Sequence, residues 1–301
     1  MEIRLLRSFT VLARYLNYGE AAQALGVSQP ALSKQIQLLE ADLGGVLFHR
    51  GRHGAELTPL GRFMHGQAQK LVADADQLQQ SGRRMAAGRI GRLTLGFGLS
   101  TQEVAPKLLS LFRERYPDVE LTLEDMPSAV QLNLLRAGEL DIGFVRLPVS
   151  HEFDWIAVVD DQLALALPVE ASWARGKAGL TAMHDAPFVQ LAHHRGAGLV
   201  DQAMRYCAAR QFTPQVIQRA GDIQTVMSLV AAGIGAAIVP ATAQRIAGPG
   251  VRLIPLTGRG AHWQVGAAWL AGNDSPLIQN FVALTREHSV RDPAPAPTVT
   301  A

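Results

Sequence analysis

The sequence predicts a mixed fold in which a small, mainly helical N-terminal domain is joined by one long helix to a larger domain with two α/β lobes. Three observations support this prediction. The chain has 301 residues, more than a single hydrophobic core usually serves. Apolar residues with helical spacing fill the first 45 residues and recur, after a short interruption, from residue 59 to about residue 88. From residue 92 onward, short apolar or β-branched runs alternate with helical stretches, which is typical of βαβ units on a mainly parallel sheet.

Composition and charge exclude several classes of protein. With 48% hydrophobic and 18% charged residues, the chain has enough apolar material for packed cores. Arg4, Arg7 and Arg14 occupy the place of the apolar region of a signal peptide, and no apolar stretch approaches the ~20 residues of a membrane span. We therefore expect a cytoplasmic protein that does not enter a membrane. The single cysteine, Cys207, offers no disulfide or metal cluster, and we expect it to pack within a helix.

Two helices are predicted at the N-terminus. Apolar residues recur at intervals of three and four over residues 3–15. Asn17, followed by Glu20 three residues later, matches a capping box, so a second, short helix is expected over residues 18–25. Gly26 ends it.

A third helix and a hairpin follow. Ser28 is a suitable N-cap and Pro30 falls in the first turn, so this helix is expected to run to the glycines at Gly44. The next segment, residues 46–57 (VLFHRGRHGAEL), has apolar ends around a basic, glycine-containing centre, which predicts a β-hairpin.

A long helix is predicted from Pro59 to about Gly88, with Thr58 as its N-cap. Its apolar residues are few and close to a seven-residue repeat, which favours pairing with a second helix, although packing on its own domain is the alternative. The residues of this seam are Leu60, Met64, Gln67, Leu71, Leu78 and Met85.

The remaining chain is predicted to form two lobes and a tail. Lobe I comprises about residues 92–161 and 267–290, and lobe II about residues 162–266. The Pro/Ala-rich segment 291–301 is expected to be disordered. Strands are expected at 93–98, 119–124, 141–145, 163–167, 188–191, 215–219, 236–239, 251–256 and 262–270. A helix is expected between the first two strands, ending at Tyr116, and others at about 128–138, 199–210, 223–232 and 276–288.

The second and third helices match a helix-turn-helix. That motif needs a small residue inside its first helix, a tight turn, and an apolar residue on the second helix that packs back on the first. Ala22, Gly26 and Leu32 have this spacing. The hairpin that follows would then be a wing.

The segment AAQALGVSQPALSKQIQLLEADLGGVLFHR, followed by LTPLGR, resembles the signature of LysR-type transcriptional regulators. The resemblance continues through AAGIGAAIVP (residues 231–240) and covers about residues 1–290. It implies a DNA-binding domain over 1–58, a linker and dimerisation helix over 59–88, and an effector-binding domain over 89–290 that resembles periplasmic binding proteins.

The resemblance also implies partners. Members of the family bind operator DNA as dimers through paired linker helices, often assembled into tetramers, and respond to a small molecule in the cleft between the lobes. RNA polymerase is a further partner if the protein activates transcription. We expect no enzymatic activity, no cofactor and no metal.

The family places the start of the recognition helix in the major groove. Gln29 can pair with a base edge, Pro30 can contact a thymine methyl group, and Lys34 can reach phosphate or guanine. Arg52 in the wing is expected in the minor groove. The candidate DNA contacts are Asn17, Tyr18, Ser28, Gln29, Pro30, Ser33, Lys34, Arg50, Arg52 and His53. Asn17 stands where the family commonly has serine, and the next residue, Tyr18, adds a phenol expected to be exposed near the phosphates.

Candidate effector contacts follow the strands of lobe I. Ser100, Thr101 and Ser128 each combine a hydroxyl group with an expected helix N-terminus, although they could serve only as N-caps. Arg146 leaves a strand toward the cleft, where it could bind an effector carboxylate or pair with an acid such as Asp222.

The sequence most resembles the branch of the family that governs aromatic and chloroaromatic catabolism. In that branch the loop before a helix of the second lobe contacts the effector. The corresponding segment is HHRGAGL, which gives His194, Gly198 and Leu199, with Leu199 where those relatives carry a bulky aromatic residue. We therefore expect an organic or aromatic acid as effector and leave its identity open.

Competing interpretations are weaker. GFGLS (residues 96–100) lacks the third glycine of a dinucleotide-binding turn, and the histidines have no metal-ligand spacing. A solute-binding protein would share the bilobal fold but needs a signal peptide where this chain has residues 1–90. A DNA-binding regulator without an effector remains the principal alternative.

Overall fold

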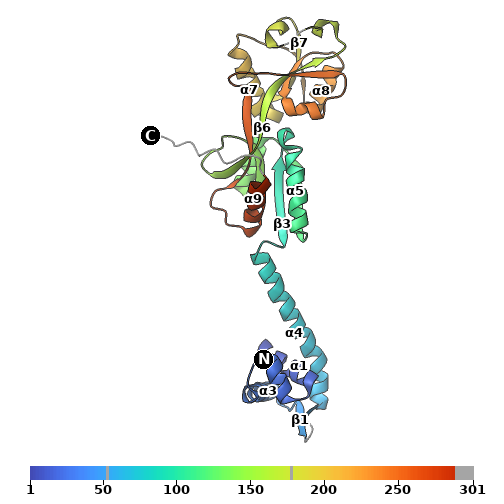
Figure 1. The fold of residues 1–301 in the computed structure, drawn as a ribbon, viewed down its shortest axis with the longest axis vertical. Coiled ribbons are helices and arrows are strands. Elements are labelled where there is room, and N and C mark those ends of the chain that lie inside the picture. Colours follow the sequence, from blue (N-terminus) through green and yellow to red (C-terminus); the bar gives the residue numbers. More distant parts are fainter. Residues whose placement is uncertain (52–53, 177–178, 289–301) are drawn as a thin grey trace, which may run out of the picture. The chain divides into compact units, whose positions relative to one another are not determined.

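A computed structural model describes residues 1–51, 54–176 and 179–288. The chain divides into two compact units, with the boundary after Ala86. Figure 1 shows the elements of each unit. The long helix belongs to the N-terminal unit. The family resemblance had predicted residues 59–88 as a linker helix separate from the DNA-binding domain. The candidate contacts Arg52 and His53 and the predicted tail 291–301 lie outside the described residues.

The N-terminal unit confirms the three predicted helices, the hairpin and the long helix. Asn17 accepts hydrogen bonds from the backbone N–H groups of Gly19 and Glu20, and Ser28 accepts one from Ala31. Gly26 and Gly44 close the second and third helices with left-handed torsions (φ 66° and 69°). The elements are α1 (Ile3–Tyr15), α2 (Tyr18–Leu25), α3 (Gln29–Leu43), β1 (Phe48–Gly51), β2 (Gly54–Leu57) and α4 (Pro59–Ala86).

The helices pack around one small core. Leu32 and Ala22 are buried together, as the helix-turn-helix prediction requires. α4 is divided along its length: Leu60 and Met64 pack against this core, whereas Leu78 and Met85 are 75% and 66% exposed. The first part of α4 thus lies on its own domain, and the remainder presents apolar residues to solvent.

The C-terminal unit contains the two predicted lobes. Its helices are α5 (Val104–Arg115), α6 (Ser128–Ala137), α7 (His193–Ala208), α8 (Ile223–Ala231) and α9 (Pro276–His288). Its strands are β3 (Gly91–Phe97), β4 (Val119–Asp125), β5 (Ile142–Arg146), β6 (Phe153–Pro168), β7 (Pro187–Leu191), β8 (Gln215–Ala220), β9 (Ala237–Pro240), β10 (Val251–Pro255) and β11 (His262–Leu270).

The prediction of a mainly parallel sheet is wrong. β3 pairs in parallel with β4 and β5, and β7 with β8, but β6 pairs antiparallel with β9, β10 and β11, and β11 also pairs antiparallel with β5. The cause is β6, a strand of 16 residues of which only its second half was predicted. Its first half pairs with β11 in lobe I and its second half with β9 and β10 in lobe II, so it connects the lobes (Figure 1).

One apolar cluster extends through both lobes. It includes Phe112 and Phe144 beside the lobe I sheet and Phe188 and Cys207 in lobe II. Cys207 is fully buried in α7, which confirms its predicted packing role. Among the described residues, no helix is both long enough and apolar enough to cross a membrane.

Candidate DNA-binding surface and inter-lobe site

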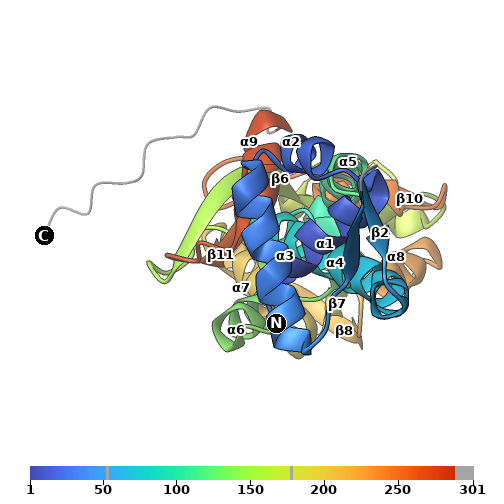
Figure 2. The same cartoon turned by 90° about the horizontal axis from the view of Figure 1, so that it is seen from below.

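The start of α3 presents polar side chains to solvent. Gln29, Pro30 and Lys34 are exposed, whereas Leu32 between them is fully buried. Seen from below, α3 is in full view, with the wing strand β2 to one side of it (Figure 2). Because a recognition helix must present its first turn, this exposure agrees with the predicted role of Gln29, Pro30 and Lys34.

Buried polar contacts hold α3 in place. Ser8 of α1, which is 2% exposed, donates a hydrogen bond to Gln35 Oε1 (2.5 Å). Glu40 accepts hydrogen bonds from the backbone N–H groups of Leu47 (2.7 Å) and Phe48 (3.4 Å), which connects α3 to the wing. These three polar residues could not be predicted from the sequence, because their role depends on partners 7 to 27 residues away.

The other predicted DNA contacts differ in exposure. Asn17 is exposed but its side chain caps α2. Tyr18 is half-buried and packs against the N-terminal core, so less of its side chain is exposed than expected. Ser33 is half-buried. Arg50 lies in β1 of the wing.

The wing and α4 meet at Thr58 and Gly61. The Thr58 hydroxyl donates to the Val46 carbonyl oxygen (2.8 Å) and accepts from the Gly61 N–H (2.9 Å). A Cβ atom added at Gly61 would lie 2.2 Å from the Leu47 carbonyl oxygen. The close approach of α4 to the wing therefore requires glycine here.

Ser100 and Thr101 lie in a 3₁₀ turn, η1 (Leu99–Thr101), and not at the N-terminus of a helix as predicted. α5 begins only at Val104, because the chain first makes this extra turn. Thr101 is fully buried and its hydroxyl donates to the Gly98 carbonyl oxygen (3.0 Å). Ser100 is the member of this pair that reaches the boundary between the lobes.

Asp161 joins the lobes at the middle of β6. Its carboxylate is buried and accepts hydrogen bonds from the Ser100 hydroxyl in lobe I (2.6 Å) and the Thr242 hydroxyl in lobe II (2.8 Å). The backbone N–H groups of Gln162 (2.8 Å) and Thr242 (3.4 Å) also donate to it. Neutral donors from both lobes thus satisfy the charge of Asp161.

A second connection between the lobes passes through Arg146. Its guanidinium donates to Gln202 of α7 and stacks on Trp263, 3.9 Å from the ring centroid. Burial lowers the pKa of Arg146 to about 10, while nearby Asp161 favours the charged form. The hydrogen-bond partner of the Arg146 guanidinium is Gln202. Asp222, which was predicted as a possible acidic partner, accepts a hydrogen bond from the Thr225 N–H and caps α8.

Two other effector candidates, Ser128 and Gly198, lie beside Arg146. Ser128 begins α6, and its hydroxyl oxygen accepts a hydrogen bond from the Arg146 backbone N–H (3.1 Å). A Cβ atom placed on Gly198 would lie 3.8 Å from Arg146 Cδ. The structure thus brings together Ser128, Arg146 and Gly198, with Ser100 linked to this region through Asp161.

The predicted contacts in α7 do not all face this region. His194 is exposed, whereas Leu199 is half-buried and packs against the main core. Gly196 has non-helical torsions (φ −165°, ψ 48°), which interrupt the helix. Leu199 also lines a pocket in lobe II together with Phe188 and Val216.

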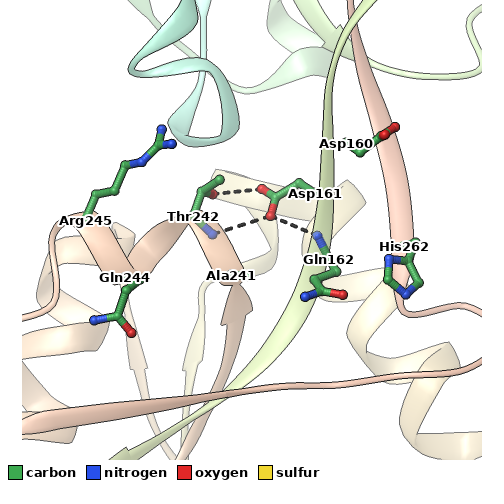
Figure 3. Close-up of a pocket in the computed structure, with 8 residues that line it drawn as sticks. All are labelled: Asp160, Asp161, Gln162, Ala241, Thr242, Gln244, Arg245 and His262. Atoms are coloured by element: carbon green, nitrogen blue, oxygen red, sulfur yellow. Dashed lines mark hydrogen bonds between the residues drawn. The ribbon is translucent and has the colours of Figure 1, made fainter. Parts of the chain in front are cut away.

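A pocket of about 490 Å³ lies beside Asp161. Figure 3 shows Gln244 and Arg245 on one side, Asp160 and His262 on the other, and the hydrogen-bonded Asp161 and Thr242 between them. Its lining residues are Asp160, Asp161, Gln162, Ala241, Thr242, Gln244, Arg245 and His262.

Asp161, Gln202 and Trp263 were not among the predicted site residues. A signal for Asp161 was present: two acids interrupt the apolar run VVDDQLALALP. Gln202 and Trp263 carry no comparable signal, because each acts through Arg146, which is 56 residues away in the case of Gln202.

Two family models match the chain, one within its N-terminal unit and one over most of its C-terminal unit. Residues 3–62 match the bacterial regulatory helix-turn-helix protein of the lysR family, and residues 86–290 match the LysR substrate binding domain. The chain belongs to the LysR family of transcriptional regulators. It is thus a DNA-binding regulator with an effector-binding domain, as the sequence predicted.

Curated relatives of this LysR-family regulator match it over nearly their whole length. The regulator IlvR of Caulobacter vibrioides is 34% identical over 293 residues, covering 95% of this chain and 98% of IlvR. CatR of Pseudomonas putida is 31% identical, covering 96% of this chain and 100% of CatR. The Hca operon transcriptional activator HcaR of Escherichia coli is 31% identical, covering 95% and 98%.

Solved structures agree with the LysR-type fold. The crystal structure of CbnR, a LysR family regulator, has a TM-score of 0.77 and 27% identity over 95% of this chain and 100% of CbnR. Full-length CbnR in complex with its target DNA has a TM-score of 0.75 and 26% identity over 95% and 99%.

Proposed function

We propose that this LysR-family regulator controls transcription in response to a small organic acid that binds between the lobes of its C-terminal domain. The observation that carries the proposal is the cluster of Ser128, Arg146 and Gly198, because it combines parts of both lobes around one guanidinium. A ligand that contacts both lobes can favour one arrangement of them and so change DNA binding.

The chemistry of this cluster favours a carboxylate. The N-terminus of α6 is at Ser128, where backbone N–H groups and the helix dipole attract negative charge. A carboxylate could also accept from Arg146, whose guanidinium has five N–H donors. Resemblance to regulators of aromatic catabolism makes aromatic acids the first candidates.

DNA binding is expected to involve two copies of the chain. Leu71, Leu78 and Met85 recur every seven residues on α4 and are 45%, 75% and 66% exposed. This spacing favours a paired helix, and the dimer would present two copies of α3 to one operator. We further propose assembly of dimers into tetramers, contact with RNA polymerase if the protein activates transcription, and a cytoplasmic location beside the chromosome.

Thermal melting tests the effector proposal. The purified protein is heated with benzoate, acetate or succinate, and a bound acid is expected to raise its melting temperature by mass action. The double variant Ser100→Ala, Ser128→Ala should lose this shift while keeping operator affinity, measured by fluorescence anisotropy. An unchanged shift in the double variant would place the acid elsewhere, and no shift with any acid would favour the effector-independent alternative.

A further inference from the structure

The pocket beside Asp161 has a different set of residues from the proposed effector site. None of its lining residues belongs to the group Ser100, Ser128, Arg146 and Gly198. It lies where β6 and β11 cross from one lobe to the other, since Gln162 pairs in register with His262. The pocket is therefore distinct from the proposed effector site.

The pocket carries both signs of charge on opposite sides (Figure 3). On one side, Arg245 is 50% exposed and forms an ion pair with Glu103 at the start of α5. Its guanidinium has five donors, so it can hold a second carboxylate without releasing Glu103. On the other side, Asp160 is exposed and accepts a hydrogen bond from Gln264 (3.0 Å). A carboxylate has about four acceptor sites, so Asp160 can also bind an ammonium group.

These charges favour a ligand with a positive group. An anion alone would bring its charge close to both Asp160 and Asp161, whereas a cation alone would contact Asp160 and leave the guanidinium of Arg245 without a ligand. Asp161 is buried and satisfied by its four hydrogen bonds, so it contributes negative potential and no free acceptor. A molecule with one carboxylate and one ammonium group matches both sides.

We propose that this pocket binds a free amino acid as a zwitterion, with its carboxylate at Arg245 and its ammonium group at Asp160. The volume of about 490 Å³ accommodates a molecule of this size. The side-chain amides of Gln162 and Gln244 also line the pocket and can hydrogen-bond a polar side chain.

The bound amino acid would sense the arrangement of the lobes. Arg245 belongs to lobe II, in the turn η4 (Ala241–Arg245), whereas its partner Glu103 belongs to lobe I. A ligand carboxylate at Arg245 shares this guanidinium with Glu103. The affinity for the amino acid therefore depends on whether the Arg245–Glu103 ion pair between the lobes is formed.

Isothermal titration of the full chain tests the proposal with matched probes. L-glutamine, L-asparagine, L-serine and L-leucine supply both charges, while glutaramate lacks the ammonium group and 4-aminobutanamide lacks the carboxylate. At least one amino acid is expected to bind, and the two single-charge analogues at least about tenfold more weakly, which corresponds to about 1.4 kcal/mol. Asp160→Asn and Arg245→Gln should each weaken amino acid binding by about the same factor.

Control variants keep the outcome interpretable. Asp154→Asn removes an exposed acid from the same strand, and Arg113→Gln removes an exposed arginine from α5, so neither should change the affinity. Binding of none of the amino acids would overturn the proposal, as would equal binding of glutaramate. Binding that survives Asp160→Asn and Arg245→Gln but is lost in Ser128→Ala would also overturn it, because the amino acid would then occupy the effector site.

Discussion

At the scale of single residues, Asp161 shows how one buried charge can connect two lobes. It accepts hydrogen bonds from Ser100 of lobe I and Thr242 of lobe II while lying on the strand that the lobes share. A buried carboxylate is tolerated only when donors surround it, so Asp161 needs these hydroxyl groups as donors. The hydroxyl groups in turn need the carboxylate as their acceptor.

Asp161→Asn is expected to destabilise the C-terminal domain by about 1–3 kcal/mol. The amide nitrogen cannot accept a hydrogen bond, so a buried hydroxyl that now donates to the carboxylate loses its acceptor. Urea unfolding measures the change, and Asp154→Asn on the exposed part of β6 is the matched control. Equal stability of the two variants would show that Asp161 does not connect the lobes.

Cys207 predicts a pH dependence of stability. Burial raises the pKa of its thiol to about 11, although Arg210 opposes the shift. In the unfolded chain the thiol ionises near its ordinary pKa of about 9. The stabilisation is therefore complete below about pH 9 and is lost as the pH rises to about 11, by about 2–3 kcal/mol in total.

Urea unfolding of wild type and Cys207→Ala at several pH values tests this expectation. Other groups also titrate in this range, so the informative quantity is the difference between the two proteins. The free energy of unfolding should fall more steeply with pH in the wild type. Parallel pH profiles would mean that the thiol ionises equally in both states.

At the scale of elements, the start of α4 depends on one close approach. Gly61→Ala would place a methyl group 2.2 Å from the Leu47 carbonyl oxygen, so either α4 or the wing must move. We expect a loss of stability and weaker operator binding. Gly66→Ala in the same helix meets nothing within 4 Å and should stabilise the protein by about 0.5–1 kcal/mol. Opposite signs of the two changes in melting temperature would confirm this account, and equal signs would contradict it.

The exposed half of α4 makes a separate prediction about assembly. Leu78→Lys should weaken self-association, measured by sedimentation velocity, because it puts a charge on the apolar seam. Gln80→Lys adds the same charge to an exposed position away from that seam and should leave association unchanged. Dimers of equal stability in both variants would exclude the seam as the interface.

Local signals explain which elements could be predicted. Asn17, Ser28 and Thr58 cap helices through contacts within three residues, so the sequence located these helix starts. The first half of β6 could not be located, because it is held by β11, about 100 residues later, with Trp263 opposite Asp161. Hydrophobic periodicity does not report such distant pairing.

The candidate site was predicted in part for the same reason. Motif position identified Ser128 and Arg146, which do lie together. It could not tell that Thr101 is buried or that Leu199 packs against the main core, because the direction of a side chain depends on turns such as η1 and the interruption at Gly196.

At the scale of the whole molecule, each structural unit corresponds to one family match. The residues for DNA binding therefore lie in the N-terminal unit and those for effector binding in the C-terminal unit. The net charge is only +2, so attraction to DNA must come from local groups such as Lys34 and not from the chain as a whole.

The continuous apolar cluster of the C-terminal domain has a calorimetric consequence. Because Phe112 and Phe188 belong to one cluster although they lie in different lobes, neither lobe can lose its core without exposing apolar surface of the other. Differential scanning calorimetry of the full chain should therefore show a single heat-absorption peak for both lobes, and separate peaks would contradict this expectation. The lobes would then move relative to one another but unfold together. A small molecule that binds to one lobe would therefore stabilise both lobes against thermal unfolding.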